Sequence, residues 1–369
     1  MATYCAEIAR AAAAQGHEVE VWTPGAPQKE DVALAPVRVI RFGGKSSLRL
    51  GSLLAFGLRV WRCRRMLRGV QVVLGSYGAQ RIFLELERWG LLGRIAAEAE
   101  LTFLFHGSEV PRYRDRFFLR GPARRVFSRA PKVCATSRYS ARLLEESGLL
   151  PSGLRVGVAL CAIRHDLLHA ARRLREHRGR PKPRDPQEPV RVLTLARLHP
   201  RKGQLETARA LAALPEAVRR KVLYQVGGTG AAAYLYQVEA ACREGGVRFA
   251  HLGAVPEERL AATYDQCDFH VMTSRALPKS VEGFGLSYLE AGVFGKPSIA
   301  CRTGGVEEAV LDGLSGILVE EGNQKELVEA LRRLIEDAEL RQVLGEGARA
   351  HALSHDWQEA ARVVFSEIG

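Results

Sequence analysis

The chain has 369 residues, of which 47% are hydrophobic and 26% charged, and its formal net charge is +13. This length and composition are typical of a globular protein with two domains. No apolar run is long enough to span a bilayer, and the seven scattered cysteines contain no Cys-x-x-Cys pair that would indicate a zinc site or a disulfide framework. The N-terminus shows no export signal, so we expect a cytoplasmic protein.

Positive charge is concentrated in the front half. Residues 1–185 contain 33 Lys and Arg against 16 Asp and Glu, a net charge of +17, and the remainder contains 21 against 25, a net charge of −4. Such a field favours an acidic partner. Nucleic acid, anionic lipid and a phosphorylated substrate are all consistent with it.

The front half opens on a predicted helix, "ATYCAEIARAAAAQG", which a strand and a glycine-rich turn should precede. Either the fold lacks a central strand, or the true start lies upstream and Met1 is a mis-assigned internal codon. We favour the second, because losing a buried parallel strand would expose the edges of its neighbours. After this helix, apolar β-rich runs predict strands over 17–22, 37–42, 70–75, 101–107, 132–137 and 154–160.

The proline-rich stretch "RGRPKPRDPQEPVR" can hold neither helix nor central strand, so it predicts a linker. Beyond it, strands and helices alternate strictly from 190 to 321, the pattern of a parallel sheet covered on both faces. We therefore predict an α/β fold of two Rossmann-like, doubly wound domains facing a cleft. Their predicted bounds are 1–180 for the N-terminal domain, 181–190 for the linker, 191–355 for the C-terminal domain, and 356–369 for a last helix that could pack back on the first domain.

Two carboxylates flank a predicted helix start in "EGFGLSYLEAGVFGKP". The amides of Phe284, Gly285 and Leu286 at this start favour a bound phosphate. Glu282 before it and Glu290 after it could accept hydrogen bonds from hydroxyls on either side, as in a sugar nucleotide. Alternatively, Glu290 only complements the helix dipole and Glu282 is a solvated loop residue.

Two cations follow the first strand after the linker, in "ARLHPRKG". Arg197 at the end of the strand and Lys202 at the mouth of the next helix could neutralise a diphosphate leaving group without a metal. The chain contains no Asp-x-Asp, so no ligand pair for a divalent ion is evident, although both cations could be ordinary solvated residues. "VGGTG" at 226–230 also follows a strand, and His106 ends a front-half strand in "LFHGSEV".

In this order, "ARLHPRKG", "VGGTG", "HLGAVPEERLAATYDQCDFHVMTS", "EGFGLSYLEAGVFGKPSIA" and "TGGVEEAVLDGLSGILVEEG" resemble the retaining glycosyltransferases of family 4, the group 1 transferases of GT-B fold. The resemblance covers nearly the whole chain, most densely from Val190 onward. It implies a nucleotide-diphosphate sugar as donor substrate, no metal and no cofactor.

The resemblance also implies residue roles. Arg197 and Lys202 match the pair on the donor diphosphate, and Glu282 and Glu290 match the Glu-x7-Glu motif that contacts the donor sugar and the ribose. His106, followed by Glu109 where the family often has Asp, matches the front-domain histidine near the transferred sugar. The remaining implied donor contacts are Gly228 and Val255 near the base and Phe284, Gly285 and Leu286 at the phosphate.

Besides Glu109, two features depart from the family pattern. The N-terminal glycine-rich loop is missing, which puts the activity of this chain in question. Where the family often shows Asn-Gly-Val-Asp, the chain has Cys161, Ala162, Ile163 and Arg164.

Two arginine-rich stretches, 47–69 and 110–129, interleave arginine with apolar and aromatic residues, among them Tyr113, Phe117, Phe118 and Phe127. They suit contact with anionic lipid at the inner face of a membrane, where a lipid-linked glycan acceptor would be found. Solvated arginine on half-buried helices is the plainer interpretation. Nucleic acid is a further rival, but no recognised nucleic-acid motif accompanies the charge. A sugar-nucleotide epimerase and a donor-binding relative without activity remain open as alternative functions.

Overall fold

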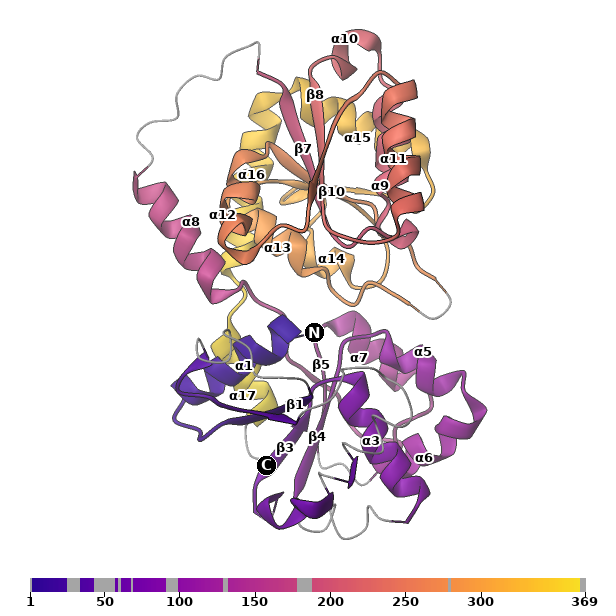
Figure 1. Ribbon diagram of the computed structural model, residues 1–369, viewed down its shortest axis with the longest axis vertical. Coiled ribbons are helices and arrows are strands. Elements are labelled where there is room, and N and C mark those ends of the chain that lie inside the picture. Colours follow the sequence, from indigo (N-terminus) through magenta and orange to yellow (C-terminus); the bar gives the residue numbers. More distant parts are fainter. Residues whose placement is uncertain are drawn as a thin grey trace. The chain divides into compact units, whose positions relative to one another are not determined.

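The computed structural model describes residues 2–24, 34–42, 57–58, 61–67, 69–90, 99–128, 132–177, 188–277 and 280–365. The chain forms two compact units, Met1–Cys161 together with Asp356–Gly369, and Ala162–His355 (Figure 1). Most of the expected linker, 181–187, lies outside the described residues. The second unit begins at Ala162 and so includes the helix α8 (His165–His177) that precedes this stretch.

Parallel strands build the first unit, as the apolar runs predicted. They form a two-stranded sheet, β1-β2, and a four-stranded sheet, β3-β4-β5-β6. No strand precedes α1 (Ala2–Ala14) within the described residues. The strands are β1 (Glu20–Pro24), β2 (Arg38–Phe42), β3 (Gln71–Leu74), β4 (Glu100–Phe105), β5 (Lys132–Ala135) and β6 (Gly157–Val158).

Aromatic packing forms the core of the first unit. The rings of Phe103, Phe105, Tyr113 and Phe127 are inaccessible to solvent and meet edge to face, with centroids between 5.0 and 6.4 Å apart. Such contacts add stability beyond the area that they bury. The helices of this unit are, besides α1, η2 (Arg64–Leu67), α3 (Tyr77–Arg88), α5 (Glu109–Arg114), α6 (Phe117–Phe127), α7 (Arg138–Glu145) and α17 (Trp357–Phe365).

The end of the chain packs on its beginning. In α17 the Gln358 carbonyl accepts a hydrogen bond of 2.7 Å from Gln15 Nε2, just after α1, and the Trp357 ring lies 5.0 Å from that of Tyr4. Tyr4 is itself held by a hydrogen bond from its hydroxyl to the Ala159 carbonyl.

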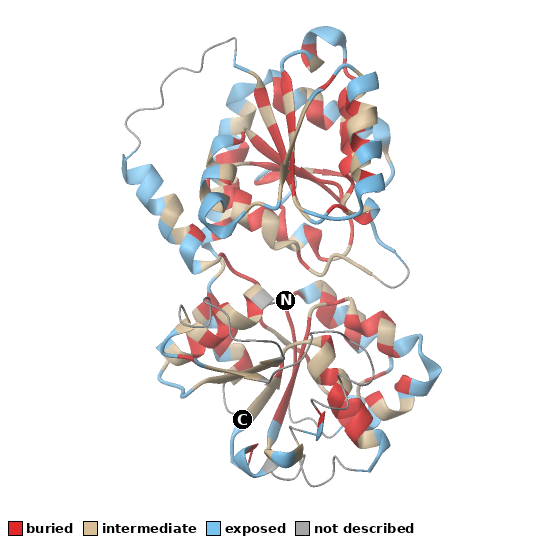
Figure 2. Ribbon diagram, in the orientation of Figure 1, coloured by how far each residue is buried: buried red, intermediate tan, exposed pale blue. Residues whose placement is uncertain are grey.

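The second unit is a six-stranded parallel sheet with the strand order β12-β11-β10-β7-β8-β9. The strands β10 and β11 are fully buried and the edge strand β9 is only half-buried, and helices cover both faces of the sheet (Figure 2). The strands are β7 (Val190–Leu195), β8 (Val222–Gly227), β9 (Arg248–Gly253), β10 (Phe269–Met272), β11 (Ser298–Cys301) and β12 (Gly316–Val319).

The strand order of this sheet reverses between β7 and β10. From β7 the chain proceeds to β8 and β9 on one side, and β10, β11 and β12 follow on the other. Loops leave such a switch point in opposite directions, which opens a crevice at the carboxyl ends of the two strands. The remaining helices are η3 (Pro200–Lys202), α9 (Gln204–Ala212), α10 (Glu216–Arg219), α11 (Ala232–Glu244), α12 (Glu257–Gln266), α13 (Leu286–Val293), α14 (Val306–Ala309), α15 (Gln324–Glu336) and α16 (Ala338–Leu353).

No described helix combines the length and the apolar character needed to cross a membrane.

Candidate donor site

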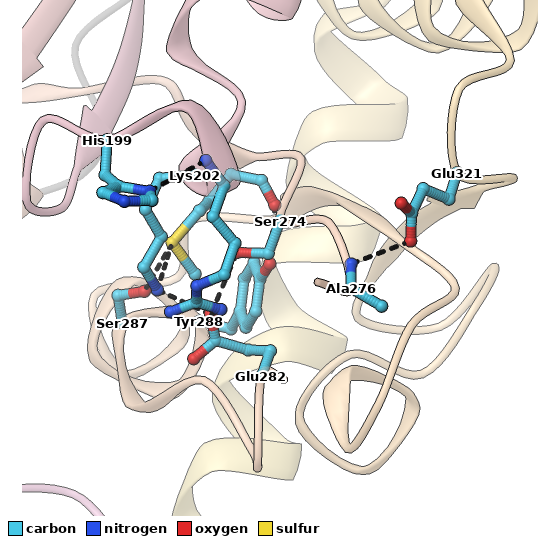
Figure 3. A network of polar contacts seen from close by, with 10 residues as sticks. His199, Lys202, Ser274, Ala276, Glu282, Ser287, Tyr288 and Glu321 are labelled. Atoms are coloured by element: carbon cyan, nitrogen blue, oxygen red, sulfur yellow. Dashed lines mark hydrogen bonds and ion pairs between the residues drawn. The ribbon is translucent and has the colours of Figure 1, made fainter. Parts of the chain in front are cut away.

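A buried ionic cluster lies at the switch point, where the loops after β7 and β10 meet. Glu282 Oε2 is 2.6 Å from Lys202 Nζ and 3.0 Å from Arg201 Nη1, and it accepts a third hydrogen bond of 3.0 Å from Ser274 Oγ. Figure 3 shows Lys202, Ser274 and Glu282 pointing toward one another. The three charged side chains are only 9 to 14% exposed, so little water reaches them. Two cations and one carboxylate give the cluster a formal net charge of +1.

Burial and pairing act in opposite directions on these groups. Burial, the largest influence, would raise the pKa of Glu282, but the charges of Lys202 and Arg201 and the hydrogen bonds outweigh it, so the pKa lies below its ordinary value. The pKa of Lys202 is lowered, chiefly by burial and despite the attraction of Glu282. Glu282 is therefore an ionised, paired carboxylate, and the interpretation of it as a solvated loop residue is wrong.

The backbone around the two loops fixes these side chains. His199 caps the short helix η3, because its Nδ1 accepts a hydrogen bond from the Arg201 amide at 3.1 Å. Gln204 Nε2 donates to the carbonyl of Arg197 at 3.0 Å, while the Arg197 side chain is exposed. On the other loop, the Gly305 amide donates to the carbonyl of Glu282 at 2.8 Å. These hydrogen bonds fix the described backbone next to Lys202 and Glu282.

The predicted anion site lies directly behind Glu282. Gly285 adopts φ +96°, a conformation that favours glycine, and the eight-residue helix α13 begins at Leu286. Phe284 is buried against the His355 ring, with centroids 5.7 Å apart, and the Tyr288 hydroxyl donates to the Met272 carbonyl at 2.6 Å. These contacts hold the amino end of α13 at the end of β10. An α-helix leaves its first amides without intrahelical acceptors, which suits an anion.

Glu290 lies about one turn into α13 and is held by a side chain of the helix α12. Its Oε2 accepts a hydrogen bond of 2.8 Å from the hydroxyl of Tyr264. Burial raises the pKa of Glu290, opposed by this hydrogen bond and by the charge of Arg164. Arg164 in turn forms ion pairs of 2.8 Å with Asp166 and 3.2 Å with Glu257.

The glycine turn after β8 packs against the loop after β7. Gly228 has φ +132°, and a Cβ at this position would lie 2.0 Å from the carbonyl oxygen of Ala196. No side chain fits there, so the turn and the loop that carries Arg197 approach closely. Val255 is half-buried next to Gly227, where an added Cβ would lie 2.9 Å from its Cγ2.

His106 lies in the first unit, at the end of β4. Its Nε2 is 3.0 Å from the Gly75 carbonyl, and its backbone amide donates to Glu109 Oε2 at 3.1 Å. Burial lowers the pKa of His106, and the charge of Glu109 opposes this effect. The imidazole is therefore neutral at physiological pH.

The structure brings together within the second unit the predicted residues Lys202, Glu282 and the amino end of α13. Sequence reasoning missed Arg201 and Ser274, which also hold Glu282. It also missed Tyr264, which donates a hydrogen bond to Glu290, and Arg164, whose charge lowers the pKa of Glu290. The sequence offered no signal that set Arg201 apart from the other cations of this loop. Arg164 had been noted only as a departure from the family pattern.

Comparison with known families covers most of the chain. Residues 176–351 match the glycosyl transferases group 1, and residues 1–157 match glycosyltransferase family 4. A GDP-mannose-dependent alpha-(1-6)-phosphatidylinositol monomannoside mannosyltransferase of Mycolicibacterium smegmatis is 32% identical over 281 residues, which is 74% of this chain and 70% of that protein. A D-inositol 3-phosphate glycosyltransferase of Xylanimonas cellulosilytica is 29% identical over 398 residues, with 99% and 90% covered.

A shorter match joins the chain to a glycosyltransferase of Methanocaldococcus jannaschii, 35% identical over 120 residues, and it spans 32% of this chain and only 33% of that protein. Among solved structures, HepE of Anabaena in complex with UDP-glucose superposes with a TM-score of 0.70 at 21% identity, covering 98% of this chain and 94% of that one. Sucrose-phosphate synthase of Thermosynechococcus elongatus superposes with a TM-score of 0.73 at 19% identity. The match covers 97% of this chain and 90% of that one.

The parallel sheets and these structural neighbours define an α/β protein of GT-B fold. The chain belongs to glycosyltransferase family 4, the group 1 glycosyl transferases, as its motifs predicted. Its enzyme class is that of the glycosyltransferases.

Proposed function

We propose that the protein transfers a sugar, with retention of anomeric configuration and without a metal, from a nucleotide-diphosphate sugar to a hydroxyl of a lipid-linked glycan, a polysaccharide or another acceptor. The observation that supports this most directly is the buried cluster of Lys202, Arg201 and Glu282 beside the amino end of α13. Two cations and a helix start suit a diphosphate, and the carboxylate suits sugar hydroxyls.

The donor proposal draws support from the relatives. HepE was crystallised with UDP, with UDP and glucose and with UDP-glucose, and the mycobacterial relative is GDP-mannose-dependent. We assign Lys202 and Arg197 to the diphosphate, Glu282 to the donor sugar and Glu290 to the ribose. Phe284, Gly285 and Leu286 would serve the phosphate, Gly228 and Val255 the base, and His106 the transferred sugar.

The proposed step needs no protein nucleophile. The bond between the anomeric carbon and the diphosphate oxygen breaks, and its electron pair stays on that oxygen. The acceptor hydroxyl attacks from the same face, and its proton passes to a phosphate oxygen of the leaving group. The protein contributes by positioning the reactants and by placing positive charge where negative charge develops.

The test is incubation of the full chain with labelled sugar nucleotides and a lipid extract, followed by separation of free and transferred label. Transfer, with the anomeric configuration of the donor kept in the product by NMR, supports the proposal. Donor binding without turnover would identify a non-catalytic relative instead. Interconversion of the free sugar nucleotides would identify an epimerase, and inversion would overturn the retaining mechanism.

A further inference from the structure

Two adjacent phenylalanines protrude from the first unit at the start of α6. Phe117 is 94% exposed and Phe118 57% exposed. Arginine surrounds them: the exposed cations of this segment are Arg114, Arg116, Arg120, Arg124 and Arg125. We call residues 114–125 the α5–α6 tip.

Phe117 and Phe118 do not take part in packing α6 against the rest of the first unit. Helix α6 is anchored through one stripe of buried residues, Leu119, Ala123, Val126 and Phe127. Phe117 and Phe118 lie outside this stripe, and at 100° per residue each shares a side of the helix with the arginine seven positions later. The tip thus presents aromatic rings and guanidinium groups together. The sequence suggested that Tyr113 and Phe127 also contribute to this surface. That prediction is wrong, because both side chains are buried in the core.

The positive charge of the tip is only partly compensated. Arg114 pairs with Asp115 at 2.8 Å and Arg125 with Glu87 at 3.1 Å. Within the described residues, no carboxylate forms an ion pair with Arg116, Arg120 or Arg124. Among the parts of the chain that the structure describes, three guanidinium groups next to the two rings therefore have no carboxylate partner.

We propose that the α5–α6 tip docks on an anionic lipid bilayer, with Phe117 and Phe118 inserted at the boundary of headgroups and acyl chains and the arginines on lipid phosphates. A fluid anionic bilayer can accept both exposed rings and the guanidinium groups beside them without a preformed pocket. Aromatic insertion and basic attraction to anionic headgroups are the two contributions that hold peripheral proteins on membranes. Membrane docking would bring the enzyme to a lipid-linked acceptor. In this role the inference rests on the proposed function.

The first test is flotation of the full chain with vesicles of phosphatidylcholine, with and without phosphatidylglycerol. We expect binding only to the anionic vesicles and its loss at high salt, because surface charges are then screened. Replacing Arg116, Arg120 and Arg124 by Gln should lower partitioning roughly a hundredfold, at about fivefold for each arginine near an anionic surface. The matched control replaces Arg209, Arg243 and Arg333, exposed arginines of the second unit, and should change partitioning little.

The apolar part has its own variants. F117S/F118S should weaken vesicle binding at least tenfold with an unchanged melting temperature, whereas Y236S/V343S, at positions 63% and 58% exposed in the second unit, should not. A Phe118→Trp variant should show a blue-shifted emission, quenched by brominated lipid, only with anionic vesicles.

Equal binding of all variants, or no vesicle binding at all, would overturn the proposal. The same would follow if the tip variants lost affinity for a single-stranded oligonucleotide while vesicles failed to bind, since the tip would then be a nucleic-acid surface. Vesicle binding is measured without donor, and donor binding without vesicles. Failure of the docking surface and failure of the transferase assignment are therefore distinguishable.

Discussion

Lys202 Nζ lies 2.6 Å from Glu282 Oε2, although the two residues are 80 positions apart in the chain. All three side-chain donors that contact Glu282 within the described residues reach this one oxygen, Oε2. Under the proposed function, Lys202 would turn toward the donor diphosphate while Arg201 and Ser274 keep the carboxylate in place. Arg201 would then act as a positioning residue for Glu282.

Lys202→Ala should abolish measurable turnover while the protein still folds. Removing one group that stabilises developing negative charge costs about 10²–10³ in kcat, and Arg201 and Ser274 still pair with Glu282. The measurement is kcat with saturating donor, with the melting temperature as the test of folding. Lys325→Ala, at an exposed position on α15, is the control. Near-normal activity of Lys202→Ala would discard the diphosphate assignment.

The Glu282→Gln variant should be less stable than the wild type, but a bound ligand should raise its melting temperature more. The change leaves two buried cations without their counter-charge, which typically costs about 3 kcal/mol in the free energy of unfolding. A nucleoside diphosphate would restore negative charge there, so its addition should raise the melting temperature of the variant more than that of the wild type. Equal shifts in the two proteins would show that the ligand does not contact this cluster.

The alternation of strands and helices after Val190 was predictable, because the central strands β7, β10 and β11 are largely buried and read as apolar runs. The convergence of Lys202 and Glu282 was predictable as well, since the ends of parallel strands share one edge of a sheet. The role of Arg201 was not. Periodicity does not tell which cations of a loop turn inward, and here both Arg201 and Lys202 do so.

The sequence also did not predict side-chain contacts between segments that are far apart in the chain. Tyr264 reaches Glu290 from another helix, and Arg164 stands in a stretch where the sequence showed only a deviation. The aromatics near α6 illustrate the same limit, since Tyr113 and Phe127 are buried while Phe117 and Phe118 are exposed. The spacing of Leu119, Ala123 and Phe127 would have indicated the buried face of that helix.

Tyr264→Phe should raise the donor KM about tenfold with little change in kcat, the expected cost of one hydrogen bond to a charged group. The ring is stacked on Phe294, with centroids 6.0 Å apart, so phenylalanine fits the same space. Burial already raises the pKa of Glu290, and loss of the Tyr264 hydrogen bond would raise it further. The defect should therefore be larger at pH 6 than at pH 8. Tyr224→Phe, which removes a core hydroxyl 3.0 Å from Thr194 Oγ1, should leave the donor KM and its pH dependence unchanged.

Turnover should be insensitive to a chelator. The proposed charge stabilisation comes from Lys202, Arg197 and the amides of α13 rather than from a divalent ion. The rate is measured with the metal-free enzyme, with and without added EDTA, and then with magnesium added back. A strict requirement for magnesium would contradict the proposal.

His270 on β10 should make the second unit sensitive to mild acid. Burial, and secondarily the charge of Lys202, lowers the pKa of His270 from 6.5 to about 3. Between these values the unfolded chain binds a proton that the folded chain does not, so stability is present above pH 6.5 and falls as the pH decreases. From pH 7 to pH 5 this group alone should remove about 2 kcal/mol from the free energy of unfolding. His270→Leu should flatten that dependence in denaturant titrations, whereas His177→Leu, at the exposed end of α8, should preserve it. If both variants kept the wild-type slope, the neutral buried imidazole would not be the cause.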